Sequence, residues 1–123
     1  MILATWNVNS IKVRLPNVLQ YLREYNPDVL VLQETKVTDD AFPSKAFTSI
    51  GYHPLYCGQK TYNGVAIITK TKPSSSNLNP VHIDKNEMRS IAIEYDNITI
   101  LNVYVVNGKS IDSDKYQYKL NWL

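Results

Sequence analysis

A carboxylate that directly follows an apolar run is the first candidate for chemistry in this sequence. Glu34 comes after Val29–Leu32 and Gln33, and a short unbroken Val/Leu run is typical of a strand buried on both faces. Ligands bind at the carboxyl ends of strands in open α/β sheets, and Mg²⁺ prefers oxygen ligands. Glu34 is therefore a candidate metal ligand. The alternative is a solvated acid at the end of a strand.

The segment before Glu34 predicts a second polar group beside it. Ile2–Trp6 is short and apolar, which indicates a buried strand that ends at Asn7. An apolar pattern at helical spacing follows, and because proline is tolerated only in the first turn, we expect the main helix to start near Pro16. Strand, helix and strand with short links form a βαβ unit with parallel strands. Asn7 and Glu34 should then lie at the same edge of the sheet.

Similar patterns predict the remaining elements. Residues 38–50 indicate a loop and a short helix, and Asp112 or Ser113 can cap a last helix. The Lys70–Pro80 segment is rich in Lys, Ser, Asn and Pro and predicts an exposed loop. A polar loop at Gly58–Gly64 contains an Asn-Gly turn signal, and Asp96-Asn97 predicts a hairpin turn. Further strands are predicted at Tyr52–Tyr56, Val65–Ile68, Ser90–Tyr95 and Ile98–Val106.

Composition narrows the class of protein. The 123 residues suit one domain, without an internal repeat or a linker, and the net charge of +2 is too small to indicate a nucleic-acid partner by itself. Cys57 is the only cysteine, which excludes an internal disulfide. The N-terminus lacks the basic start of a signal peptide, and no stretch has the length of a membrane span. We therefore expect a soluble, cytoplasmic protein.

Several segments together resemble the exonuclease III family. This family is the bacterial apurinic/apyrimidinic endonuclease branch of the endonuclease/exonuclease/phosphatase superfamily. The resemblance covers nearly the whole chain, in order and at the right spacing. It is carried by Ala4–Ser10, Gln33–Lys36, Thr38–Pro43, Tyr62–Ile67, Asn102–Tyr104, Asn107-Gly108 and Asp114–Tyr116.

The resemblance implies a fold and an activity. The fold is a four-layer α/β sandwich, of which residues 1–123 would be the N-terminal half, with one mixed sheet and flanking helices. The activity is hydrolysis of phosphodiesters in double-stranded DNA that depends on Mg²⁺ or Mn²⁺. It comprises incision at abasic sites and 3′-to-5′ trimming.

The resemblance also implies roles for six residues. Glu34 matches the metal-binding Glu, and Asn7 matches an active-site Asn that we also consider as a metal ligand. Tyr104 matches the Tyr that contacts the scissile phosphate. Contacts to the DNA backbone are implied for Tyr62, Arg89 and Asn107. From the residues alone, Asn7 could instead cap a helix, Tyr104 could form a cross-strand pair, and the others could be solvated.

This sequence departs from the family pattern in two places and at its end. Val106 stands where the family usually has Pro, and Met88 precedes Arg89 where a small residue is common. The chain stops at Leu123, before the family's Asp-x-Asn, further Asp and Asp-His segments, which activate the attacking water. His53 and His82 are the only histidines, and nothing places either near Glu34.

Three readings of function follow. The first is half of a DNA repair nuclease that is inactive alone, with an open apolar sheet face that makes it self-associate or need the missing half. The second is a module that binds DNA without cutting it. The third is a phosphoesterase of the same superfamily that acts on small molecules or lipids, against which Gln33–Lys36 and Tyr62–Gly64 argue.

Overall fold

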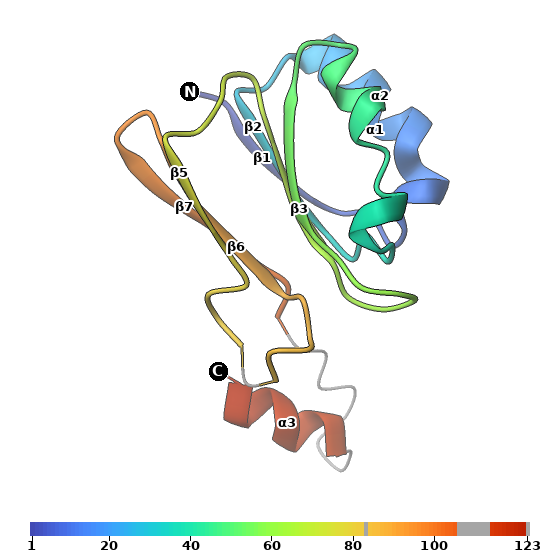
Figure 1. Ribbon diagram of the computed structural model, residues 1–123, viewed down its shortest axis with the longest axis vertical. Helices are drawn as coiled ribbons and strands as arrows, with labels where there is room; N and C mark the ends of the chain where they lie inside the picture. Colours follow the sequence, from blue (N-terminus) through green and yellow to red (C-terminus); the bar gives the residue numbers. More distant parts are fainter. Residues whose placement is uncertain (83, 106–113, 123) are drawn as a thin grey trace.

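The computed structural model describes residues 1–82, 84–105 and 114–122. Figure 1 shows two β-sheets side by side, with helices against the outer face of one of them. The helices are α1 (Ile11–Tyr25), α2 (Ser44–Thr48) and α3 (Asp114–Trp122), and a 3₁₀ turn spans Asp39–Ala41. The strands are β1 (Leu3–Asn7), β2 (Val29–Gln33), β3 (His53–Cys57), β4 (Val65–Thr69), β5 (Ser75–Leu78), β6 (Ser90–Tyr95) and β7 (Ile98–Val103).

The first sheet has the strand order β1-β2-β4-β3. Strands β1 and β2 are parallel, with Asn7 opposite Gln33, and the other pairings are antiparallel. The predicted βαβ unit is therefore confirmed. Its two strands end at the same edge of the sheet.

The central strands β2 and β4 are buried on both faces, as the Val/Leu run predicts. On one face, Leu30 and Leu32 pack with Val18 and Leu22 of α1 and with Phe47 of α2. On the other face, side chains of β2 and β4 pack against a second sheet; these include Val29, Val31, Val65, Ile67, Ile91, Ile93 and Ile100. The four-residue runs thus supply both cores, which explains why they carry no polar residue.

The second sheet corrects two predictions. We expected one mixed sheet with flanking helices, but Ser90–Tyr95 and Ile98–Val103 form a separate antiparallel sheet, in the order β5-β6-β7. The Lys70–Pro80 segment, predicted as an exposed loop, contributes Ser75–Leu78 as its third strand. Backbone pairing with β6 holds these polar, exposed residues in a strand, because the ladder uses backbone groups. The α/β fold class itself is confirmed.

Two predictions about the N-terminal segment were also wrong. Helix α1 begins at Ile11, where the Ser10 hydroxyl accepts a 3.4 Å hydrogen bond from the Val13 backbone N–H, and Pro16 lies inside the helix. Pro16 is the sixth residue of α1, past the first turn, so the helix continues through it without the bond that an N–H there would donate to the Lys12 carbonyl. Strand β1 is half exposed, with Leu3 at 52%, because it lies at the edge of the sheet.

The hairpin and the last helix match the sequence patterns. Asp96 and Asn97 link β6 to β7 with φ angles of 52° and 66°, as in a type I′ turn. Helix α3 lies where the last helix is predicted, but Asp112 and Ser113, its predicted caps, fall outside the described residues. Among the described helices, none has the length and apolar character needed to cross a membrane.

Candidate active site

The backbone at the ends of β1 and β2 places the first two candidate residues together. Asn7 is the last residue of β1 and Glu34 follows β2 directly. Pairing continues past both strands, since Val8 N–H donates to the Gln33 carbonyl at 3.0 Å and Ser10 N–H donates to the Glu34 carbonyl at 2.8 Å. Glu34 has a left-handed φ of 58°, an uncommon conformation for a side-chain-bearing residue that often marks a functional site.

The Glu34 carboxylate has a partner at each oxygen. Its Oε2 accepts a hydrogen bond from the Asn7 side-chain amide. Its Oε1 lies 3.7 Å from the Lys36 ammonium, which also donates to Asn9 Oδ1 at 2.5 Å. The structure thus brings Asn7 and Glu34 together, as expected. Asn9 and Lys36 complete a small polar cluster.

A tight approach of two loops fixes the backbone under this cluster. Thr35 N–H donates to the Gly64 carbonyl at 3.1 Å, and Lys36 N–H donates to the Asn63 carbonyl at 2.9 Å. Gly64 has a φ of +90°, and a Cβ there would lie 2.2 Å from the Thr35 hydroxyl oxygen. Position 64 therefore needs glycine both for its conformation and for this close approach.

Tyr104 reaches the cluster from the second sheet. It follows β7 directly and is half buried. The Arg89 guanidinium lies over its ring, 4.7 Å from the ring centroid. Burial raises the pKa of the Tyr104 phenol above its usual value of 10.0, and the negative charge of Glu34 raises that pKa further, while Arg89 opposes the shift. The phenol therefore keeps its proton near neutral pH and can donate a hydrogen bond.

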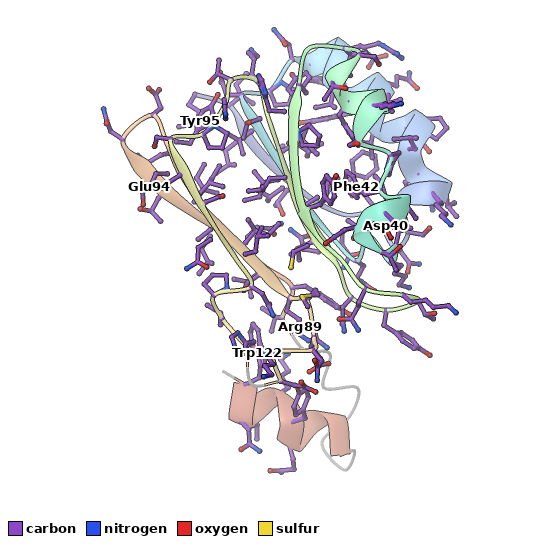
Figure 2. All side chains as sticks on the ribbon, in the orientation of Figure 1. Asp40, Phe42, Arg89, Glu94, Tyr95 and Trp122 are labelled. Carbon is purple, nitrogen blue, oxygen red and sulfur yellow. The ribbon has the colours of Figure 1, made fainter. Side chains whose placement is uncertain are left out.

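Arg89 is packed beneath Tyr104 and is only 7% exposed. Its Nη1 donates to the Tyr104 carbonyl at 3.3 Å, and its Nη2 donates to Glu87 Oε2 at 3.2 Å. Glu87 also accepts a hydrogen bond from the Tyr118 hydroxyl of α3. Figure 2 shows Arg89 at the end of the molecule nearer α3. In this structure the Arg89 guanidinium contacts protein groups, and its buried Nε has no hydrogen-bond partner among the described residues.

Of the other two residues with an implied DNA contact, the structure describes only Tyr62. Tyr62 is 68% exposed in the loop between β3 and β4, the loop whose base pairs with Thr35 and Lys36. Asn107 lies outside the described residues. Beside the Tyr62 loop, a shallow pocket of about 270 Å³ is lined by three lysines from separate segments, Lys12, Lys36 and Lys60.

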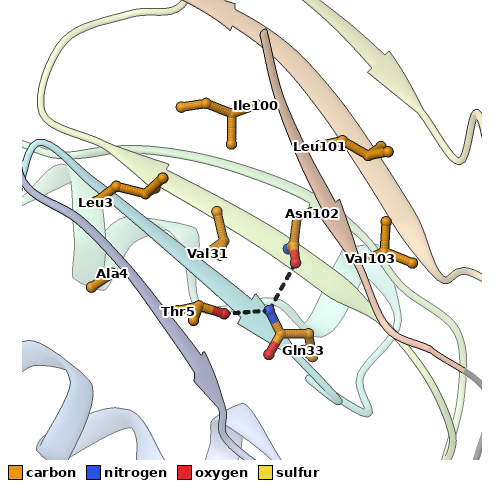
Figure 3. Close-up of a pocket in the computed structure, with 9 residues that line it drawn as sticks. All are labelled: Leu3, Ala4, Thr5, Val31, Gln33, Ile100, Leu101, Asn102 and Val103. Atoms are coloured by element: carbon orange, nitrogen blue, oxygen red, sulfur yellow. Dashed lines mark hydrogen bonds between the residues drawn. The ribbon is translucent and has the colours of Figure 1, made fainter.

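Two polar residues near the site were not singled out from the sequence. Part-buried Gln33, directly before Glu34, donates a hydrogen bond to buried Asn102, two residues before Tyr104, and this bond joins the two sheets (Figure 3). Both residues border a cavity of about 390 Å³ between β1 and β7, whose lining is mostly apolar. The sequence signal was Asn102 itself, a polar residue in a strand whose other buried residue is Ile100.

The donor set at Glu34 fits a magnesium ion that keeps most of its waters. Mg²⁺ is usually bound through one or two carboxylates plus waters and substrate phosphates. Glu34 supplies one carboxylate, and within the described residues no group of three or more His, Cys, Asp and Glu side chains forms a metal cluster. Asn7 turns its amide nitrogen to Glu34, while its Oδ1 accepts from Asn9 N–H at 3.2 Å. As a metal ligand, Asn7 would need to rotate its amide.

Curated relatives are DNA-processing enzymes. The chain is 33% identical to exodeoxyribonuclease III of Haemophilus influenzae over 111 residues, which cover 86% of this chain and 42% of that protein. It is 32% identical to the DNA-(apurinic or apyrimidinic site) endonuclease of Dictyostelium discoideum, over 98% of this chain and 34% of that protein. The chain thus spans less than half the length of both.

Solved structures have the same fold over the whole chain. The 3′ phosphatase NExo from Neisseria, bound to a product DNA hairpin, has a TM-score of 0.94 and 45% identity. An AP endonuclease from Archaeoglobus fulgidus has a TM-score of 0.93 and 45% identity. Each match covers 99% of this chain and 48% of the solved one.

These matches confirm the resemblance to the exonuclease III family that the sequence motifs indicate. The model of the wider family spans almost the entire chain, including the segments that position Asn7, Glu34 and Tyr104. Because that match runs over residues 4–122, the chain belongs to the endonuclease/exonuclease/phosphatase family.

Proposed function

We propose that this chain carries the metal- and phosphate-binding part of a DNA repair nuclease of the exodeoxyribonuclease III type. The reaction is metal-dependent hydrolysis of phosphodiesters at abasic sites in double-stranded DNA, with 3′-to-5′ trimming. One observation carries the proposal: the Asn7 amide holds the Glu34 carboxylate, and that carboxylate lies close enough to the Tyr104 phenol to raise its pKa. Together these groups offer a cation ligand and a hydrogen-bond donor to one phosphate.

In this proposal Glu34 holds Mg²⁺ or Mn²⁺, and Asn7 orients the carboxylate. When bound, the ion would polarise a phosphoryl oxygen and offset the charge that develops on it. Tyr104 donates a hydrogen bond to a nonbridging oxygen of the scissile phosphate. A tyrosine phenol is protonated at neutral pH, so this donor is present there.

The DNA backbone is held by groups around this centre. Tyr62 projects from the surface, and the pocket lined by Lys12, Lys36 and Lys60 offers positive charge beside it. Lysine contacts to phosphates supply sequence-independent affinity. The resemblance assigns backbone contacts to Arg89 and Asn107 as well. Arg89 would then serve the phosphate from beneath Tyr104, where its guanidinium lies 4.7 Å from the ring centroid.

A second substrate is suggested by a solved relative. The Neisseria structure is described as a 3′ phosphatase bound to a product DNA hairpin. A terminal 3′-phosphate monoester, like a diester, carries nonbridging oxygens that could bind a metal ion held by Glu34 and accept a hydrogen bond from Tyr104. We therefore include removal of 3′-phosphates from DNA as a second candidate reaction.

Cleavage also needs a base within hydrogen-bond reach of the attacking water. In the family, the segments expected to supply it are not among the motifs of these 123 residues. We therefore expect the chain alone to bind duplex DNA without cleaving it.

The test is a chimera in which these 123 residues replace the matching segment of Haemophilus influenzae exodeoxyribonuclease III. We expect Mg²⁺-dependent incision of a duplex with one abasic site, and release of phosphate from a 3′-phosphate hairpin if the second reaction holds. Glu34→Gln should abolish incision, and Tyr104→Phe should slow it. Glu24→Gln, an exposed carboxylate on α1, is the matched control.

The outcomes separate the candidate functions. A folded chimera that binds duplex DNA but never incises it would favour a DNA-binding module. Incision that survives Glu34→Gln would contradict the assignment of the metal site. For the isolated chain, incision that depends on Glu34 would contradict only the expectation that it is inactive alone.

A further inference from the structure

Asn102 is a polar residue buried at the interface between the two sheets. It is 2% exposed and lies on β7, in the second sheet. Its amide nitrogen donates to the Leu32 carbonyl at 2.9 Å and to the Ala66 carbonyl at 2.8 Å. Leu32 and Ala66 face each other across the β2–β4 pair. Asn102 thus fixes the point at which β7 crosses the first sheet.

Gln33 completes the connection. Its Nε2 donates to Asn102 Oδ1 at 2.8 Å and to the Thr5 hydroxyl oxygen at 2.9 Å, as Figure 3 shows. Both amide groups therefore use both of their hydrogens. The two side chains join β1, β2 and β4 of the first sheet to β7 of the second. We call the Gln33–Asn102 pair the inter-sheet clamp.

The clamp lies between the two halves of the candidate site. Gln33 directly precedes Glu34, and Asn102 is two residues before Tyr104. Glu34 extends from the first sheet and Tyr104 from the second, so their separation depends on how one sheet sits on the other.

The remaining contacts between the strands of the two sheets are mostly apolar side chains. Outside the strands, Gly64 N–H donates to the Met88 carbonyl at 2.9 Å. The Thr71 hydroxyl donates to the Tyr95 hydroxyl at 2.9 Å. Apolar burial is non-directional, whereas a hydrogen-bond network that satisfies the buried Asn102 amide specifies one arrangement at that point.

We propose that the inter-sheet clamp positions Tyr104 relative to Glu34. Gln33 and Asn102 act as positioning residues, and neither contacts the phosphate. The inference rests on the proposed function, in which Glu34 and Tyr104 serve the same phosphate.

The test measures the coupling between Glu34 and Tyr104 by NMR, in the full 123-residue chain with ¹³C-labelled tyrosine and without metal or DNA. The Tyr104 ring signal is identified by its loss in Tyr104→Phe. Glu34→Gln should shift this signal in the wild-type background. The same substitution should leave the signal unmoved in Asn102→Leu and in Gln33→Met.

Matched substitutions control for the changes in side-chain chemistry. Asn77→Leu alters an exposed Asn on β5, and Gln20→Met alters an exposed Gln on α1 whose amide donates to Glu24. In both control backgrounds the shift caused by Glu34→Gln should persist. If Asn102→Leu does not fold, Gln33→Met carries the test, because it leaves the two bonds from Asn102 to Leu32 and Ala66 in place.

The outcomes distinguish the clamp from the site. A full shift in Gln33→Met, and in Asn102→Leu where it folds, would overturn the clamp while leaving the proposed function standing. Absence of the shift in the wild-type background would show that Glu34 and Tyr104 are not neighbours. That result would overturn the site and the clamp together.

Discussion

Lys36 is the residue that would compete most directly with a cation at Glu34. Its ammonium lies 3.7 Å from Oε1, on the carboxylate that a metal would need. Lys36 also lines the pocket that it shares with Lys12 and Lys60, where a bound phosphate would attract its ammonium away from Glu34. The two positions suggest an exchange, in which Lys36 leaves the carboxylate as metal and DNA bind.

Removing this competitor should strengthen metal binding. We expect Lys36→Met to tighten Mn²⁺ binding by up to about fivefold, because a partly exposed ion pair contributes at most about 1 kcal/mol. Isothermal titration calorimetry without DNA measures the change. Lys45→Met, an exposed lysine on α2, should have no effect, and Glu34→Gln should remove binding. Unchanged or weaker affinity in Lys36→Met would contradict the competition.

Burial suppresses the reactivity of the Cys57 thiol. Burial raises the pKa of its thiol to about 11, with a smaller contribution from the negative charge of Asp39. Because the thiolate is the reactive form, the native chain should react with iodoacetamide at pH 8 far more slowly than the chain in denaturant. Mass spectrometry follows the modification. Equal rates in the two conditions would show that the thiol is accessible.

At the scale of elements, sequence patterns predicted the strands and helices that depend on local periodicity. The unbroken Val/Leu run placed β2 in the centre, and the βαβ rule placed Asn7 beside Glu34. What was missed depended on pairing between distant segments. Ser75–Leu78 is a polar segment that becomes a strand only because β6 lies alongside it. No periodicity within such a segment reveals its partner.

The candidate site shows the same difference between features that local motifs predict and contacts that join distant segments. Glu34, Asn7 and Tyr104 came from motifs, and the structure gathers them in one place. The burial of Arg89 under Tyr104 and the Gln33–Asn102 contact join β2, β6 and β7, which are far apart in the chain. Such contacts depend on how two sheets stack, so they could not be predicted from residue spacing.

The turn at Gly64 offers a clean test of how two loops hold the site. Gly64 and Gly51 share a left-handed φ, of +90° and +87°, but a Cβ at Gly51 would meet nothing within 4 Å. Gly51→Ala should therefore cost only the conformational strain, about 1 kcal/mol. Gly64→Ala should cost a further 1–3 kcal/mol or so, because the Thr35 hydroxyl must move. Urea denaturation measures both changes, and equal costs would contradict the steric explanation.

At the scale of the whole molecule, the two sheets leave apolar side chains exposed along one side. In the described part of the chain, β1 and β7 each pair with one neighbour only, so each presents an unpaired backbone edge. Leu3 and Leu101 on these strands are 52% and 49% exposed and border the cavity between the sheets. Unpaired edges beside an apolar surface favour association with another chain.

We therefore expect the isolated chain to self-associate through the β1 and β7 edges. Sedimentation velocity should show dimers or larger species whose proportion grows with concentration. Leu3→Lys and Leu101→Lys should each shift the chain towards monomer, because a buried ammonium at the contact is costly and edge lysines oppose strand pairing. Leu78→Lys is the matched control: this leucine is 50% exposed on β5, at the opposite edge of the second sheet. It should leave association unchanged. A wild-type chain that stays monomeric at all concentrations, and melts cooperatively, would contradict association through these edges.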